Sequence, residues 1–102
     1  MKGEIKMINA KEAYDLSAPN VDTYRAFIDE RIRNAAAAGN LRIEIREDPY
    51  SMWLYGTVNE LAKRDACAAK VVRELIDMGY KVKQHYKESQ FVDVALVISW
   101  EK

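Results

Sequence analysis

The segment from Phe91 to Trp100, FVDVALVISW, decides the fold of this chain. Apolar residues occupy both phases of its alternation, as in a β-strand that is buried on both faces. One face carries Val92, Val94, Leu96, Ile98 and Trp100, and the other carries Phe91, Ala95 and Val97. A strand that is apolar on both faces must be covered on both faces. Because one chain of 102 residues has little material for two covers, this segment predicts a protein that self-associates.

Two further strands complete the expected sheet. Residues 80–86 form a strand that turns through a loop at 87–90 into the strand at 91–100, so these two make an antiparallel hairpin. Residues 41–46, LRIEIR, alternate apolar and charged side chains and form the first strand. The strand at 91–100 is the most apolar, so we place it at the centre, with the other two strands parallel to each other on either side. The result is a predicted mixed sheet of three strands, in the order 1-3-2 along the chain.

Two helices are expected before the first strand. Asn9 has the position of an N-cap for the first helix, and Pro19 ends it because the residue before a proline avoids the helical region. Asn20 caps a second helix that continues through Ala38. Gly39 follows as a terminator in the left-handed conformation.

The main helix is expected between the first two strands. Thr57 and Glu60 have the spacing of a capping box, so this helix starts near Val58 and ends at Gly79. The apolar stretch within residues 48–56 predicts an irregular segment packed over the edge of the sheet. The chain is therefore expected to be a single α+β domain over residues 1–102. It has two N-terminal helices followed by β-α-β-β, with helices on one face of the sheet.

The overall charge balance narrows the class of protein. The chain carries 16 basic and 16 acidic residues, so its formal net charge is zero. A nucleic-acid binder usually has a basic surplus, because it must neutralise phosphates. That surplus is missing, which argues against a nucleic-acid partner unless the fold creates a local basic patch. Near-neutral charge also means little self-repulsion, which is compatible with association.

Cysteine usage and hydropathy indicate the compartment. The single cysteine, Cys67, excludes an intrachain disulfide and fits a reducing environment. The N-terminus alternates charged and apolar residues and does not resemble a signal peptide, and the longest apolar run is far too short to span a membrane. These features predict a cytoplasmic protein with no membrane contact.

No group of residues has a pattern typical of catalysis or metal binding. His85 is the only histidine, and Cys67 lies in the middle of a predicted helix without a basic neighbour. No glycine-rich loop leads from a strand into a helix, so there is no phosphate-cradling motif. We therefore expect no catalytic residue, no metal and no cofactor, and we favour a protein that is not an enzyme.

The first feature that suggests a function is a row of basic residues on one strand. Lys81, Lys83, His85 and Lys87 recur at every second position, which places all four on one face of the strand. Such a row can hold an anionic ligand such as a nucleotide phosphate. The alternative is edge protection, because lysines on an edge strand discourage aggregation of sheets.

An aromatic cluster is the second such feature. Tyr50, Trp53 and Tyr55 fall within six residues, and Tyr and Trp are typical anchors of protein interfaces. The alternative is that this segment completes the core. The expected interface joins these aromatic residues to the second face of the strand at 91–100. Its predicted members are Tyr50, Trp53, Tyr55, Phe91, Ala95 and Val97.

Four short segments carry a resemblance to known proteins. They are Ile8–Ala13 (INAKEA), Gly39-Asn40, Leu75–Val82 (LIDMGYKV) and Ile98–Trp100 (ISW). With these the chain resembles small proteins of unassigned function encoded by tailed phages, which share such an opening, helix-to-strand junction and ending. The aromatic stretch at 50–55 departs from that pattern. The resemblance implies a viral origin and a place in the infected host's cytoplasm or in the virus particle, and it implies no activity.

These observations lead to an expected function. We expect a small, non-enzymatic, self-associating binding protein whose partner is a second copy or another protein. The alternative is a protein that sequesters a small anionic ligand such as a nucleotide, or inhibits a host protein. A structural component of a virion is the lesser alternative.

Overall fold

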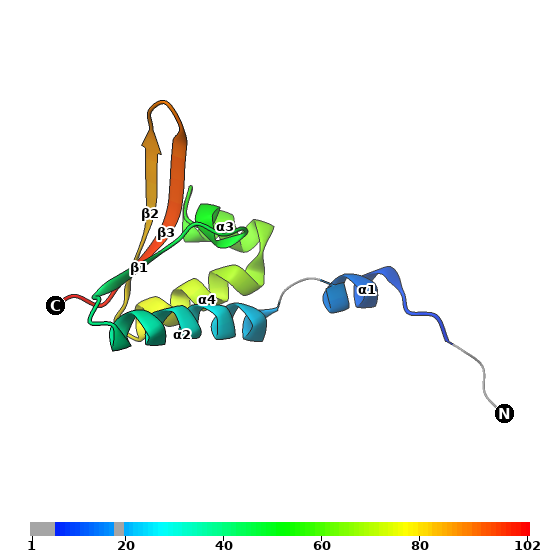
Figure 1. Cartoon of the computed structure of the whole chain (residues 1–102). Helices are drawn as coiled ribbons and strands as arrows, with labels where there is room; N and C mark the ends of the chain where they lie inside the picture. The colour runs from blue at the N-terminus through cyan, green and yellow to red at the C-terminus, as the bar shows by residue number, and fades with distance from the viewer. Residues whose placement is uncertain (1–5, 18–19) are drawn as a thin grey trace.

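The computed structural model describes residues 6–17 and 20–102, and its elements form an α+β fold (Figure 1). The sheet has three strands, β1 (Arg42–Ile45), β2 (Lys81–Glu88) and β3 (Val92–Ser99), in the order β1-β3-β2. The predicted order is confirmed, but the predicted mixed sheet is wrong. β1 and β2 do run in the same direction, yet β3 separates them, so every hydrogen-bonded pair of strands is antiparallel.

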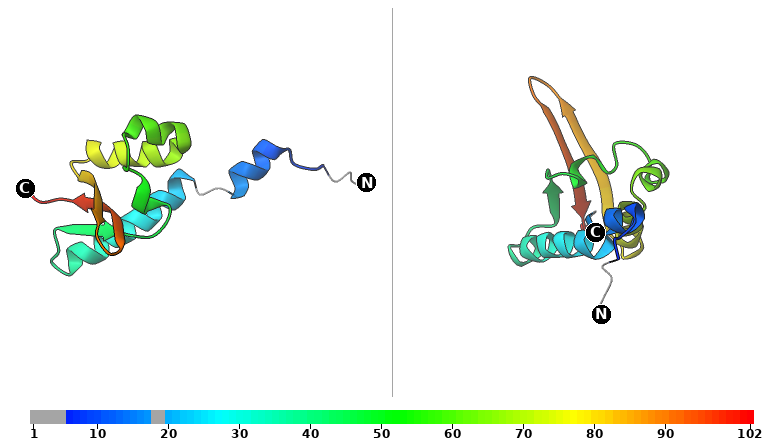
Figure 2. Two further views of the ribbon diagram at one scale, coloured as in Figure 1. Left: turned by 90° about the horizontal axis from the view of Figure 1, so that it is seen from above. Right: turned by 90° about the vertical axis from the view of Figure 1, so that its right-hand side faces the viewer.

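Two helices precede the sheet, as predicted. The first helix, α1 (Ala10–Ser17), begins after Asn9, whose side chain accepts a hydrogen bond from the backbone N–H of Glu12 at 2.8 Å. The second helix, α2 (Val21–Ala37), is capped by Asn20 and is followed by Gly39 at a φ of 87°. α1 extends away from the body formed by the other elements (Figure 2). The predicted stop at Pro19 lies outside the described residues.

The predicted main helix is two helices. α3 (Val58–Arg64) begins with the predicted capping box of Thr57 and Glu60, and α4 (Ala66–Asp77) follows it. Between them Asp65 has an extended backbone, with φ −153° and ψ 94°. The prediction of one continuous helix is therefore wrong at this residue. The break has a local reason, because the Asp65 side chain accepts a hydrogen bond from the backbone N–H of Ala68 and so starts a new helix.

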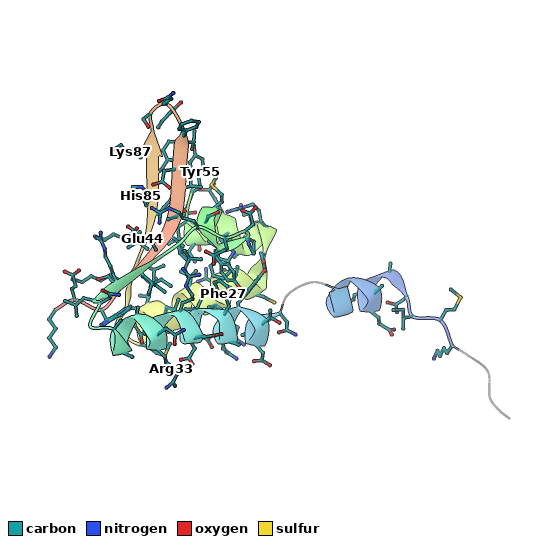
Figure 3. All side chains as sticks on the ribbon, in the orientation of Figure 1. Phe27, Arg33, Glu44, Tyr55, His85 and Lys87 are labelled. Atoms are coloured by element: carbon teal, nitrogen blue, oxygen red, sulfur yellow. The ribbon has the colours of Figure 1, made fainter. Side chains whose placement is uncertain are left out.

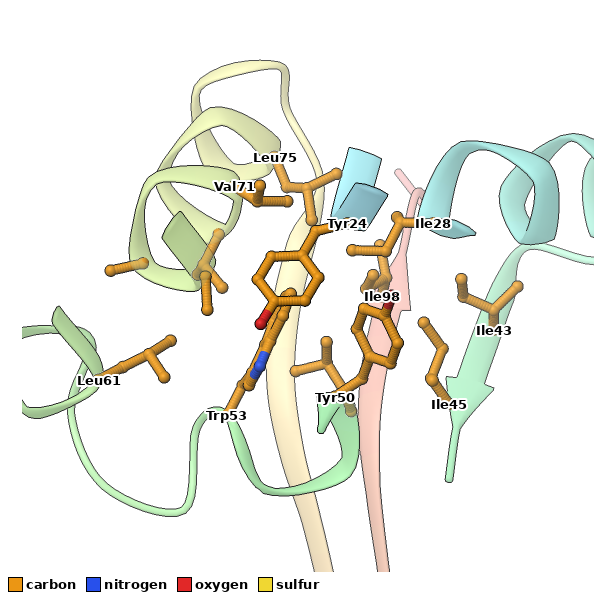
Figure 4. Packing of buried hydrophobic residues seen from close by; sticks show 14 residues of the cluster. Tyr24, Ile28, Ile43, Ile45, Tyr50, Trp53, Leu61, Val71, Leu75 and Ile98 are labelled. Carbon is orange, nitrogen blue, oxygen red and sulfur yellow. The ribbon is translucent and has the colours of Figure 1, made fainter. Parts of the chain in front are cut away.

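The core lies on one face of the sheet, which we call the inner face. It is formed where α2 and α4 pack against the apolar side chains of β1 and β3, with Ile28 and Leu75 contributed by the helices (Figure 4). The buried strand residues are Ile43, Ile45, Leu96 and Ile98. The predicted cover of helices on one face is confirmed, and the alternation of β3 places Leu96 and Ile98, from its more apolar phase, inward.

The segment between β1 and α3 contributes to the same core. It holds a short 3-10 helix, η1 (Tyr50–Met52), and two of its aromatic side chains, Tyr50 and Trp53, turn inward. The Tyr50 ring stacks on Phe27 with centroids 4.3 Å apart, and the Trp53 ring meets Tyr24 edge-on at 4.8 Å. Edge-to-face and stacked pairs of this kind stabilise a core beyond the area they bury. The segment is therefore part of the core and does not merely lie over the sheet edge.

Candidate functional site

The face of the sheet opposite the helices is charged. We call it the outer face, and the strand register defines it. Its residues are Arg42, Glu44 and Arg46 from β1 and the residue after it, Lys81, Lys83, His85 and Lys87 from β2, and Asp93, Ala95, Val97 and Ser99 from β3. His85, Lys87 and Glu44 appear on one side of the hairpin and Tyr55 on the other (Figure 3).

Arginine–carboxylate ion pairs and a histidine–carboxylate contact connect the three strands across the outer face. The Arg46 guanidinium donates to Asp93 from Nε at 2.9 Å and to Glu44 at 3.3 Å. His85 Nε2 lies 3.1 Å from the same Asp93 carboxylate, and Arg42 lies 3.7 Å from Glu44. The Arg46 hydrogen bond, with a smaller effect of His85, lowers the pKa of Asp93 from 3.8 to about 2. The contacts of Asp93 therefore stabilise the fold above pH 3.8, and this contribution is lost as the pH falls through about 2.

The predicted basic row lies on this face. Lys81, Lys83 and Lys87 are exposed, and none of them pairs with a carboxylate among the described residues. β2 is an edge strand, as the edge-protection alternative requires. The fold adds Arg42 and Arg46 to the row from the other side of β3, which the sequence analysis did not foresee.

The predicted interface residues fall into two groups, of which the first is internal. Tyr50, Trp53 and Ala95 are buried, and Val97 is half-buried. Ala95 is fully covered although none of the described helices lies over the outer face, because it is small and sits among long charged side chains, with His85 opposite it on β2. The second face of β3 therefore needs no second layer, and these side chains offer little to a partner.

The second group is exposed and lies at the projecting end of the hairpin. Exposed aromatic and aliphatic side chains occur there on two neighbouring segments: Tyr55 and Tyr86, whose rings lie 5.3 Å apart, and Phe91 and Val92 at the start of β3. We call this group the hairpin patch, and it comprises Tyr55, Tyr86, Phe91 and Val92, which are 57%, 42%, 78% and 58% exposed. The sequence analysis named Tyr55 and Phe91 but missed Tyr86 and Val92, which it took for ordinary strand residues.

The same end of β3 has an open backbone edge. β1 pairs only with residues 96–99, so residues 92–95 have β2 on one side and, among the strands of the described residues, no partner on the other (Figure 1). The Trp100 N–H donates to the Leu41 carbonyl, which sets the alternation of the antiparallel pair. By that alternation the N–H and C=O groups of Val92 and Val94 point to the open side.

A half-buried polar clamp, missed by the sequence analysis, holds the hairpin to η1. The Gln84 amide donates from Nε2 to the carbonyl of Ser51 at 2.6 Å and accepts at Oε1 from the N–H of Leu54 at 3.2 Å. The same Nε2 lies 3.3 Å from the carbonyl of Ala95. Gln84 lies between Val82 and Tyr86 on the inward-facing side of β2. A polar residue among apolar inward positions is the sequence signal that could have indicated the clamp.

Replacing Gln84 by alanine is expected to lower the free energy of unfolding by about 1–3 kcal/mol, because it leaves backbone groups of Ser51 and Leu54 unpaired. Urea unfolding followed by tryptophan fluorescence measures the loss. Lys83→Ala, one residue earlier on the exposed outer face, is the control and should change stability by less than about 0.5 kcal/mol. Equal losses in the two variants would contradict the clamp.

Other chemistry is not evident in the described residues. They contain no group of His, Cys, Asp and Glu that could hold a metal ion, and Cys67 is a half-buried thiol on α4. None of the helices they form is long and apolar enough to cross a bilayer. Comparison with protein families, with curated proteins and with solved structures finds no match to this chain.

Proposed function

We propose that this protein is a small, non-enzymatic binding protein that self-associates through the projecting end of its β2–β3 hairpin. The observation that carries the proposal is the coincidence of two features there. The edge of β3 is open at Val92 and Val94, and the apolar hairpin patch lies beside it. An open edge with apolar side chains is a template for pairing with another strand.

The pairing that fits this edge is the addition of a second copy. Two β3 ends can align antiparallel about a two-fold axis, so that each supplies the backbone partners of the other. Burial of Phe91 and Val92 contributes about 1.5–3 kcal/mol for each side chain that leaves water. Zero formal net charge leaves little long-range repulsion between copies.

The double variant Phe91→Ser/Val92→Pro tests this interface. Val92 begins β3 and its N–H points to the open side, so a proline there removes a donor from the edge and none from the β2–β3 ladder. At micromolar concentration the wild type is expected to sediment above its 11.7 kDa chain mass, and the variant at that mass.

The control variant is Ile76→Ser/Met78→Ser, which removes two exposed apolar side chains from the end of α4, far from β3 in sequence. It should associate as the wild type does. A wild type that stays at 11.7 kDa throughout, or a control that dissociates as the hairpin variant does, would refute the proposed interface. A discrete dimer supports a binding protein, whereas an open-ended size distribution supports the structural virion component.

A further inference from the structure

The fold separates charges that the composition presents as balanced. The outer face brings together five cations, Arg42, Arg46, Lys81, Lys83 and Lys87, and two carboxylates, Glu44 and Asp93. The chain as a whole has equal numbers of acids and bases, so the rest of it carries the compensating acidic surplus. The local basic patch that the net charge could not show is therefore present on one face of the sheet.

Neither carboxylate of the outer face forms an ion pair with a lysine of that face. Glu44 and Asp93 are both engaged by Arg46, and Glu44 also lies near Arg42. Lys81, Lys83 and Lys87 are exposed and extend from the edge strand β2 with no carboxylate within ion-pair distance among the described residues. We propose that the outer face binds the phosphate backbone of a nucleic acid, without reading its sequence.

The length of the lysine row favours a polymeric ligand over a single nucleotide. Alternate residues of a strand are about 6.6 Å apart, so the ends of the row at Lys81 and Lys87 are separated by about 20 Å. Each strand of a duplex carries one phosphate per about 3.4 Å of helix axis, so a row of this length spans the axial rise of about six phosphates of one strand. A single nucleotide reaches only one or two of these lysines, whereas a strand of nucleic acid reaches all three.

The composition of the outer face explains why sequence is not read. Sequence-tolerant stacking platforms use aromatic side chains, and direct readout requires an element that enters a groove. The outer face has no Phe, Tyr or Trp among its residues, and its two arginines, the usual bidentate readers of base edges, lie near or are paired with Glu44 and Asp93. Its contacts with nucleic acid are therefore electrostatic and fall with added salt.

Fluorescence anisotropy with a labelled 20-nucleotide oligothymidylate and a duplex of equal length tests the proposal. The outer-face variant Lys81→Ala/Lys83→Ala/Lys87→Ala is compared with Lys11→Ala/Lys63→Ala/Lys70→Ala, whose lysines lie on α1, α3 and α4. Both variants lower the net charge equally, so their difference reports the position of the lysines. The melting temperature of each variant is measured to check that the variant remains folded.

The outer-face variant is expected to bind the single strand at least tenfold more weakly than the control at about 50 mM salt. Its log–log salt dependence should be shallower than that of the wild type by about 2, because each phosphate contact on a single strand contributes about 0.7 to the slope. The proposal is overturned if the wild type binds neither probe, if the two variants weaken equally, or if ATP binds as tightly as the oligonucleotide. The last result would assign the row to a mononucleotide.

Discussion

Replacing Trp53 by alanine is expected to lower the free energy of unfolding by about 3–5 kcal/mol, the usual cost of removing a buried large aromatic side chain. Trp53 is 2% exposed, and its ring lies 4.8 Å from Tyr24 and 4.9 Å from Tyr50. The cavity would open at the centre of the aromatic cluster, between α2 and η1. Urea or thermal unfolding followed by circular dichroism measures the loss, since the variant lacks one of the two tryptophans.

Two companion variants sharpen this test. The buried Trp53 Nε1 has no hydrogen-bond partner among the described residues, so Trp53→Phe removes an unpaired donor and should cost much less than the alanine variant. Tyr55→Ala changes an exposed aromatic residue of the same segment and should cost less than about 1 kcal/mol, while weakening association. If Tyr55→Ala destabilises as much as Trp53→Ala, the division of this segment into core and surface is wrong.

Replacing Asp65 by alanine is expected to lower the free energy of unfolding by about 2–4 kcal/mol, because one carboxylate serves two purposes. It caps α4 through the N–H of Ala68, and it accepts a hydrogen bond of 2.5 Å from the hydroxyl of Tyr24. Burial, with the hydrogen bond to Asp65, raises the pKa of Tyr24 well above its ordinary value, so the hydroxyl remains a donor. The variant would leave this buried hydroxyl without a partner.

Three further variants separate the two purposes. Tyr24→Phe removes only the hydroxyl, and Asp65→Asn keeps an oxygen acceptor at a favourable N-cap, so both should cost less than Asp65→Ala. Asn20→Ala removes a cap of α2 that is exposed to water and should cost about 1 kcal/mol. The shared role of Asp65 is contradicted if Asp65→Ala costs no more than Asn20→Ala in chemical denaturation.

The helix break at Asp65 is a feature that the sequence pattern did not predict. Residues 58–77 read as one helix because their apolar positions recur at helical spacing and no proline or glycine interrupts them. The side chain that stabilises the break meets Tyr24, 41 residues earlier in the chain. Helical spacing along one continuous helix would also place Ile76 on the buried stripe with Val72, yet Ile76 is 48% exposed.

The sequence predicted only part of the candidate site, because the rest depends on the pairing of distant strands. The strand alternation placed Lys81, Lys83, His85 and Lys87 on one face, and the register confirms this. The arginines that join them come from β1, on the far side of β3, and only the pairing of strands brings them to the same face. Formal charge summed over the chain has no spatial content, so it concealed the basic outer face.

The sequence by itself determined the three strands, the two N-terminal helices, the caps named below and the strand order, because each depends on neighbours within about four residues or on which strand is most apolar. Asn20, Thr57 and Gly39 act where the pattern placed them. Only the tertiary structure decided which side chains are covered and which polar groups meet. Trp53 became core and Tyr55 surface within one short segment, and Gln84 became a clamp. These outcomes depend on distances between residues far apart in the chain, which a one-dimensional pattern does not contain.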